Sequence, residues 1–171
     1  MKRLVLLCAL VVCFGGVARA QDHPALETSF DYSYVHASDS GFSANLNGGS
    51  ASVAFNPSSW LGLVADFGGY KGTQNGLDGG NVFTYMFGPK VAMRQGRFTP
   101  YAQALFGGGH ADVAGATNNA FAMALGGGAD VNLTEHIGVR VIQAEYVLTR
   151  FNFVTNQQNN VRISAGVVFR F

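Results

Sequence analysis

Charged residues are scarce in this chain of 171 residues. Asp, Glu, Lys and Arg together make up only 12% of it, whereas a soluble domain usually carries about 25%. Much of the folded surface is therefore expected to face something other than water. Eight basic and ten acidic residues remain once Lys2, Arg3 and Arg19 are set aside with a predicted leader. This balance lacks the basic excess of nucleic-acid binders, so no nucleic-acid partner is expected.

The chain also lacks an apolar run long enough to cross a membrane as a helix. The run over residues 4–17 is shorter than the roughly 20 residues that a bilayer requires. It follows Lys2 and Arg3 and precedes the small-x-small sequence Ala18-Arg19-Ala20. This pattern predicts a secretory signal peptide over residues 1–20, cleaved near Ala20, and a mature domain over residues 21–171.

Cysteine is confined to the predicted leader. Cys8 and Cys13 are the two cysteines of the chain, so the mature domain is expected to have no disulfide, thiol nucleophile or cysteine metal site. About 150 residues remain after cleavage, enough for one domain.

What the mature sequence does contain is alternation. Polar and apolar residues alternate with the period of 2 that is typical of strands. Eight such stretches are separated by turn-forming residues: 26–36, 46–56, 61–71, 81–93, 98–109, 120–132, 137–149 and 160–171. The last of them places Val161, Ile163, Val167 and Phe169 on one face and Arg162 and Arg170 on the other.

The aromatic content of the apolar faces indicates which way they point. Phe83, Tyr85 and Phe87 share one face of a single stretch. Several such strands would overfill the interior of an eight-stranded barrel, which is just wide enough for side chains. The apolar faces are therefore predicted to contact lipid and the polar faces to line the lumen. A closed barrel also pairs every backbone group within the bilayer. The predicted fold is all-β, an eight-stranded antiparallel up-and-down transmembrane β-barrel.

The connections are predicted to alternate in length, with short turns on the periplasmic side and longer loops outside. The short turns are 56–60, 94–97 and 133–136, and the longer loops are 37–45, 72–80, 110–119 and 150–159. Trp60 lies at the edge of the first short turn, where an interfacial aromatic is expected.

The seventh stretch departs from strict alternation. If Arg140 faces inward, Gln143 and Glu145 fall on the outward phase. A β-bulge near Val141 and Ile142 would reset the phase, with Glu145 inward and Tyr146 outward.

This phasing predicts a polar network in the lumen, made of Glu27, Asp31, Asp66, Lys90, Gln103, Asp130, Arg140, Glu145, Arg162 and Arg170. Isolated buried ions cost several kcal/mol, so these groups are expected to pair. The favoured interpretation is a salt-bridged core that fills a narrow barrel, and a path or gate for ions is the alternative.

The residues 137–153 (IGVRVIQAEYVLTRFNF) and 160–171 (NVRISAGVVFRF), with the eight-stranded spacing, resemble the OmpA-like outer-membrane β-barrel superfamily. The resemblance covers essentially the whole mature chain, but only the barrel domain, so no peptidoglycan-binding domain is expected. It implies an integral location in the outer membrane, contact with outer-membrane lipid and lipopolysaccharide, and recognition by the barrel-assembly machinery through a terminal strand ending at Phe171.

No catalytic, cofactor-binding or metal site is expected. His23, His36, His110 and His136 are scattered without metal-ligand spacing. The sequence His36-Ala37-Ser38-Asp39 approaches the His-x-Ser-Asn motif of lipid A deacylases, but Asp39 replaces the Asn. The sequence thus predicts a non-enzymatic barrel with an envelope-structural or surface-interaction role. A narrow small-solute pore and a lipid A-modifying enzyme remain as alternatives.

Overall fold

The computed structural model describes residues 23–39, 42–74, 77–113, 116–151 and 157–171, so the predicted signal peptide lies outside the described residues. These residues form eight strands: β1 (Leu26–Asp39), β2 (Phe42–Phe55), β3 (Leu61–Gln74), β4 (Leu77–Ala92), β5 (Phe98–Val113), β6 (Ala116–Asn132), β7 (Ile137–Phe151) and β8 (Gln157–Arg170). Among them is no helix that is long and apolar enough to span a membrane.

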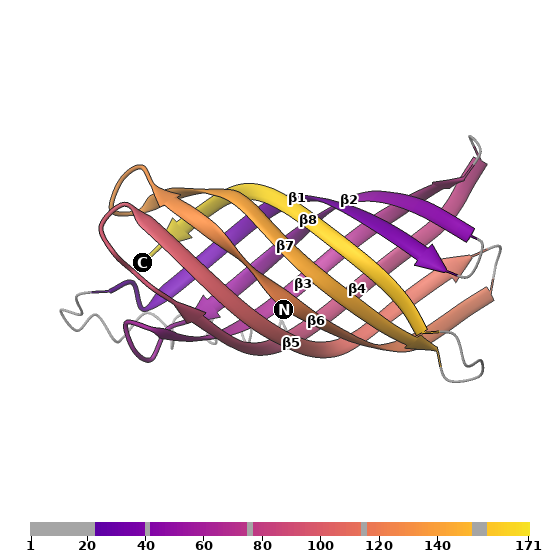
Figure 1. Cartoon of the computed structure of the whole chain (residues 1–171), viewed down its shortest axis with the longest axis horizontal. Helices are drawn as coiled ribbons and strands as arrows, with labels where there is room; N and C mark the ends of the chain where they lie inside the picture. Colours follow the sequence, from indigo (N-terminus) through magenta and orange to yellow (C-terminus); the bar gives the residue numbers. More distant parts are fainter. Residues whose placement is uncertain (1–22, 40–41, 75–76, 114–115, 152–156) are drawn as a thin grey trace, which may run out of the picture.

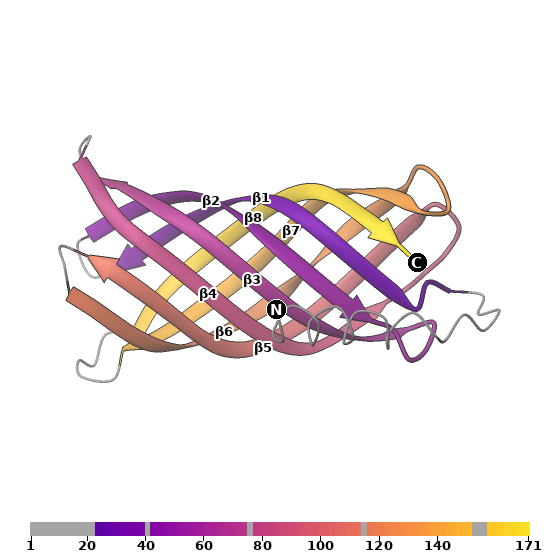
Figure 2. The same cartoon turned by 180° about the vertical axis from the view of Figure 1, so that it is seen from behind.

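The strands close into one antiparallel barrel in which each strand pairs with its neighbours in sequence. Closure is made by β1 and β8, whose ladder runs from Glu27 opposite Arg170 to Ser38 opposite Asn159. Backbone hydrogen bonds between Leu26 and Phe171, at 3.1 and 2.8 Å, extend the seam to the last residue. Figures 1 and 2 show the tilted strands enclosing an elongated cylinder. The predicted fold class is confirmed.

The outward faces are apolar and the inward faces polar. Phe83, Tyr85 and Phe87 keep 49%, 45% and 50% of their surface exposed, although they lie in the middle of a strand. Thr84 and Met86, which alternate with them on β4, are buried in the lumen. A soluble barrel would reverse this arrangement, so the exposed aromatic faces match a barrel surrounded by lipid.

The expected bulge in β7 is present. Asp130 pairs with Arg140 while the preceding Ala129 pairs with Ile142, so Val141 is the extra residue. The ladder with β8 is interrupted at the same place, between Arg140 and Gln143. Because of this extra residue, Arg140 and Glu145 both face the lumen and Tyr146 faces outward, although Arg140 and Glu145 are an odd number of positions, five, apart.

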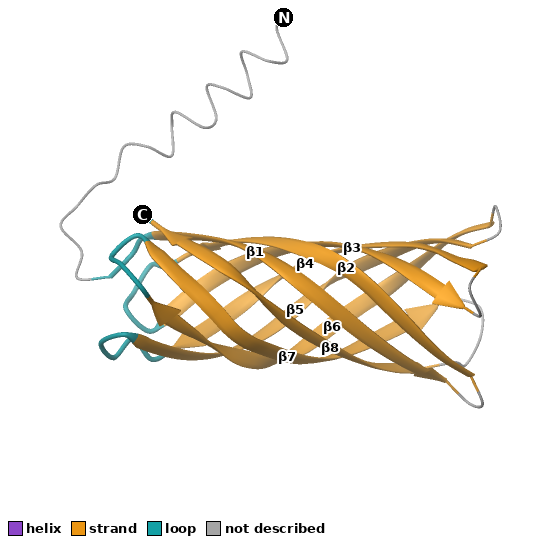
Figure 3. Cartoon of the chain, turned by 90° about the horizontal axis from the view of Figure 1, so that it is seen from above, coloured by secondary structure: helices purple, strands orange, loops and turns teal. Residues whose placement is uncertain are grey.

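The predicted contrast in loop lengths is wrong. The strands continue through most of the segments assigned to long loops, and each strand is 14 to 17 residues long. A tilted transmembrane strand needs about 9–11 residues to cross a bilayer, so the strand ladders extend beyond the apolar part of the membrane. Backbone pairing does not require apolar side chains, which explains why Gly- and Asn-rich segments continue the hairpins. Figure 3 shows the described turns at the end of the barrel that holds the carboxyl terminus.

Two glycines permit close approach of neighbouring strands. A Cβ atom on Gly88 would overlap the carbonyl oxygen of Ala104, and one on Gly107 would overlap that of Tyr85. Glycine within these strands therefore allows the strong curvature of a small barrel.

Candidate functional site

The lumen holds the polar network that the strand phases predict. Each of the ten side chains is at most 6% exposed: Glu27, Asp31, Asp66, Lys90, Gln103, Asp130, Arg140, Glu145, Arg162 and Arg170. They come from seven of the eight strands, because every strand turns alternate residues inward. The network has three clusters. They follow one another along the barrel, and the first lies at the end that holds the chain termini.

The first cluster surrounds the carboxylate of Glu27 at the start of β1. The ammonium of Lys90 donates to Glu27 Oε2 at 2.5 Å. Arg94 Nη2 lies 3.3 Å and Arg170 Nε 3.4 Å from Glu27 Oε1. One acid is thus surrounded by three cations, and Arg170 also reaches Asp130 at 3.6 Å.

The second cluster is built on the guanidinium of Arg140. Its Nε donates to Asp130 Oδ1 at 3.0 Å, and its Nη1 donates to Asp31 Oδ2 at 2.9 Å. The hydroxyl of Ser29 lies 3.0 Å from the same Nη1 and 2.7 Å from Asp31. The guanidinium also lies over the ring of Tyr101, with 5.0 Å to the centroid. Two carboxylates and an aromatic face therefore compensate one buried cation.

The third cluster is built on Arg162, the largest of the fully buried side chains. Its Nε donates to Glu145 Oε2 at 2.6 Å, and its Nη1 donates to Asp66 at 2.9 Å and to the Tyr70 hydroxyl at 2.8 Å. Gln103 and Gln143 each donate to Glu145 at 2.8 Å. Charge-assisted bonds of this kind are the strongest that a buried network offers.

The clusters are joined into one network. The Arg170–Asp130 pair connects the first to the second, and Tyr101 connects the second to the third by donating its hydroxyl to Gln143 at 2.6 Å. Beside this polar column lies an apolar cluster: Ala54, Val64, Met86, Leu105, Ala122, Ala124 and Val147. An eight-stranded barrel is just wide enough for side chains to fill it, and these described polar and apolar side chains lie in its interior.

Four contributors were absent from the sequence prediction: Arg94, Tyr70, Tyr101 and Gln143. Tyr70 shares the even phase of Asp66 on β3, and Tyr101 shares the odd phase of Gln103 on β5. Continuing the phase of Lys90 by two steps reaches Arg94, which the predicted turn over residues 94–97 excludes from the strand. The inward orientation of Gln143 follows from the bulge in β7. The phase of the strands therefore contains the signal for these four residues, but the prediction that aromatic rings face the lipid excludes Tyr70 and Tyr101 from the lumen.

With Arg94 included, five acids face five bases in the described lumen: Glu27, Asp31, Asp66, Asp130 and Glu145 against Lys90, Arg94, Arg140, Arg162 and Arg170. Every one of these ten groups lies within 4.0 Å of an opposite charge. Mutual pairing is what compensates the desolvation of so many ions.

Three of the described histidines lie on separate elements, His36 on β1, His110 on β5 and His136 in the turn before β7. Within the described ranges, no three His, Cys, Asp or Glu residues gather closely enough to hold a metal ion. His36 Nδ1 lies 2.8 Å from Asn45 Oδ1, and His110 Nδ1 lies 2.7 Å from Asn119 Oδ1, on separate hairpins. The side chains of Ser38 and Asp39 lie outside the described residues, so the deacylase-like motif stays a sequence prediction.

Alternating lipid-facing and lumen-facing residues on a closed antiparallel sheet define an integral outer-membrane barrel. The model of the outer membrane protein beta-barrel domain family matches residues 4–171, and the chain belongs to this family. The resemblance to OmpA-like barrels is therefore confirmed. No curated protein matches the sequence.

Solved barrels of several bacteria have a similar fold. Neisserial surface protein A superposes with a TM-score of 0.63 at 18% identity, covering 88% of this chain and all of that chain. Ail, the attachment invasion locus protein of Yersinia pestis, superposes with a TM-score of 0.60 at 17% identity, covering 87% of this chain and 99% of that chain. The N-terminal barrel domain of Pseudomonas aeruginosa OprF superposes with a TM-score of 0.59 at 14% identity, covering 88% of this chain and 100% of that chain. At these identities the likeness shows the fold.

Proposed function

We propose that this protein is a non-enzymatic outer-membrane barrel with a closed lumen that serves an envelope-structural or surface-interaction role. The observation that carries the proposal is the complete pairing of the described lumen charges. An ion path requires charged groups that can exchange partners with water or a permeating ion. Here Arg162 alone binds Glu145, Asp66 and Tyr70, with the guanidinium 2% exposed.

The competing pore function is tested by conductance. Purified mature protein, fused into planar bilayers, is expected to give no steady current steps, and a general-diffusion porin in the same membrane serves as the positive control. Reproducible ohmic steps that scale with protein concentration would contradict a closed lumen.

The surface role is supported by the length of the hairpins. The β5–β6 ladder continues to Val113 opposite Ala116, beyond the last lipid-facing aromatic of β6, Phe121. Two of the barrels with the same fold carry names that describe surface location and attachment. The hairpins opposite the chain termini are the part of this molecule that reaches beyond the outer leaflet.

Single-cysteine labelling tests this orientation, since the predicted mature chain has no cysteine of its own. Thr117→Cys lies near the tip of the β5–β6 hairpin, and Ser58→Cys lies in the turn between β2 and β3. A membrane-impermeant maleimide is expected to label Thr117→Cys on intact cells and Ser58→Cys only after permeabilisation. The reverse pattern would place the termini outside and refute the proposal.

The absence of an enzymatic role is tested at the one motif that suggests chemistry. Lipid A from cells expressing wild type and Ser38→Ala is expected to give the same mass spectrum as lipid A from cells without the protein. Loss of an acyl chain that depends on Ser38 would establish a deacylase instead.

A further inference from the structure

Basic side chains collect at the end of the barrel that holds the chain termini. The first two clusters and the adjoining turns hold five of the eight basic residues of the predicted mature chain: Lys90, Arg94, Arg97, Arg140 and Arg170. The described acids of this region are four: Glu27, Asp31, Asp130 and Glu135. This end therefore carries one positive charge in excess, whereas the third cluster sets one arginine against two acids.

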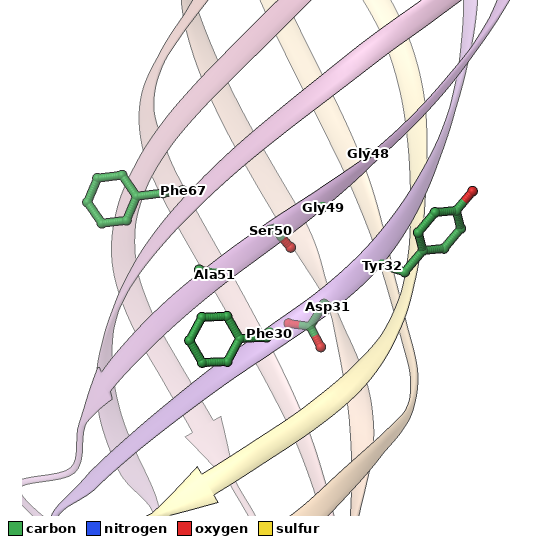
Figure 4. Close-up of a pocket in the computed structure, with 8 residues that line it drawn as sticks. All are labelled: Phe30, Asp31, Tyr32, Gly48, Gly49, Ser50, Ala51 and Phe67. Carbon is green, nitrogen blue, oxygen red and sulfur yellow. The ribbon is translucent and has the colours of Figure 1, made fainter.

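Two of these acids pair with Arg140 in the second cluster. Its guanidinium lies 2.9 Å from Asp31 and 3.0 Å from Asp130. In Figure 4 the side chain of Asp31 leaves β1 in a different direction from the outward rings of Phe30 and Tyr32. The first cluster is left with one carboxylate of its own for three cations, and with a share of Asp130.

Two guanidinium N–H groups of the first cluster have no acceptor among the described residues. Arg94 Nε and Arg170 Nη2 are both buried and make no hydrogen bond. Arg170 Nη2 lies 3.6 Å from Asp130 Oδ2, which is too long for a hydrogen bond. Buried donors are nearly always paired in folded proteins, and an unpaired donor on a charged group is costly. The cluster thus has donors as well as charge to offer to a further anion.

The two arginines are held side by side at the mouth of the barrel. Arg94 Nη2 and Arg170 Nε lie 3.3 and 3.4 Å from the same oxygen, Glu27 Oε1. Asn132 joins their elements, since its Oδ1 accepts from Arg170 Nη1 and its Nδ2 donates to the carbonyl oxygen of Gly96 at 3.3 Å. The turn that carries Arg94 is therefore fixed against the strand that carries Arg170.

Arg94 is the member of the cluster that solvent reaches. Its side chain is 13% exposed, whereas those of Glu27, Lys90 and Arg170 are 4%, 4% and 5% exposed. Arg94 lies between the end of β4 and the start of β5. Its guanidinium can therefore turn toward an entering ion without any change in strand pairing. Arg97, in the same turn, is exposed and adds a positive charge beside the entrance.

We propose that this end of the barrel is an anion site that binds a phosphate group, either the free ion or a phosphate ester of a periplasmic solute, between Arg94 and Arg170. The planar guanidinium fork matches phosphate geometry, and a tetrahedral phosphate has enough oxygens to accept from both arginines. A carboxylate has two oxygens and would repeat the part that Glu27 already fills. The periplasmic source of the ligand rests on the orientation given under the proposed function.

The test is a titration followed by the ¹⁵N–¹H signals of the arginine Nε–Hε groups, with the purified mature barrel in detergent micelles. Sodium phosphate replaces sodium chloride at constant ionic strength, and parallel titrations use glycerol 3-phosphate and acetate. Arg94→Gln removes one arm of the site, and Glu27→Gln removes the competing acid. Lys71→Gln, an exposed cation on β3 far from these termini, is the control. The heat-dependent gel shift of a folded barrel checks that each variant has folded.

We expect millimolar phosphate to shift the signals of Arg94 and Arg170 to saturation and to leave that of Arg162 in place. Arg94→Gln should weaken phosphate binding about fivefold, because a charge-assisted hydrogen bond is lost at a partly exposed site. Glu27→Gln should tighten it about threefold, since the carboxylate no longer competes for the same donors. A purely structural role of the cluster would not produce this gain. Lys71→Gln should bind phosphate as wild type does.

The absence of a saturable shift in phosphate would overturn the proposal, as would an equal response to acetate or unchanged affinity in folded Arg94→Gln. If Arg94→Gln does not fold, Glu27→Gln decides, and weaker binding by that variant would refute the site. Tighter binding of glycerol 3-phosphate than of inorganic phosphate would identify an ester as the ligand, and the reverse order the free ion. Micelles have no inner and outer side, so failure here is distinct from failure of the cell-labelling experiment.

Discussion

Arg162 is the side chain whose removal tests the lumen network most directly. It is 2% exposed and holds two carboxylates and a tyrosine hydroxyl. Arg162→Met keeps a long apolar stem in place but leaves Glu145 and Asp66 without a cation. The nearest remaining support for Glu145 is neutral, from Gln103 and Gln143.

The expected cost follows from the environment of the pair. Breaking a buried ion pair on one side costs about 3–5 kcal/mol, because the partner charge stays buried and uncompensated. Two acids share this arginine, so we expect the upper part of that range. The triple variant Arg162→Met/Asp66→Asn/Glu145→Gln removes all three charges. It is expected to recover at least half of the loss, since replacing a whole buried pair is often close to neutral.

Urea-induced unfolding in lipid vesicles measures these differences. Trp60 is the one tryptophan of the chain and, being 58% exposed at the edge of the barrel, reports folding into the bilayer. Arg97→Met, which removes an exposed arginine from a turn, is the matched control and should change the unfolding free energy by less than about 0.5 kcal/mol. If Arg162→Met costs no more than this control, or if the triple variant is less stable than the single one, the pairing argument is wrong.

Three further predictions concern the barrel wall. Deleting Val141 removes the bulge residue and leaves every other β7 residue on its present face, so the variant should still fold, as measured by gel shift. Deleting Ala51 from the regular strand β2 should abolish folding, because the deletion shifts the register of that strand. Equal outcomes for the two deletions would contradict the bulge at Val141. Gly107→Val should cost at least about 2 kcal/mol in the same urea assay, because its side chain overlaps the backbone of β4, whereas Gly69→Val should stay within about 1 kcal/mol. Phe87→Arg should cost about 2–4 kcal/mol if its position is near the bilayer midplane, and a cost below that of Arg97→Met would argue against lipid contact.

The strand faces were predictable because their cause is local. A period of 2 in Phe83, Tyr85 and Phe87 places those rings on one side whatever the rest of the chain does. The bulge at Val141 was predictable for the same reason, since Arg140 and Glu145 could not otherwise share a face. The strand ends were not predictable, because hairpin pairing continues through residues such as Gly72 and Asn118 that carry no apolar signal.

Within the lumen, the sequence determined which groups face inward, and the tertiary structure decided how they pair. Arg162 meets Asp66 across 96 positions of sequence, and Arg140 meets Asp31 across 109. These partners depend on the tilt and register of strands that are distant in the chain, which alternation along a single strand does not encode.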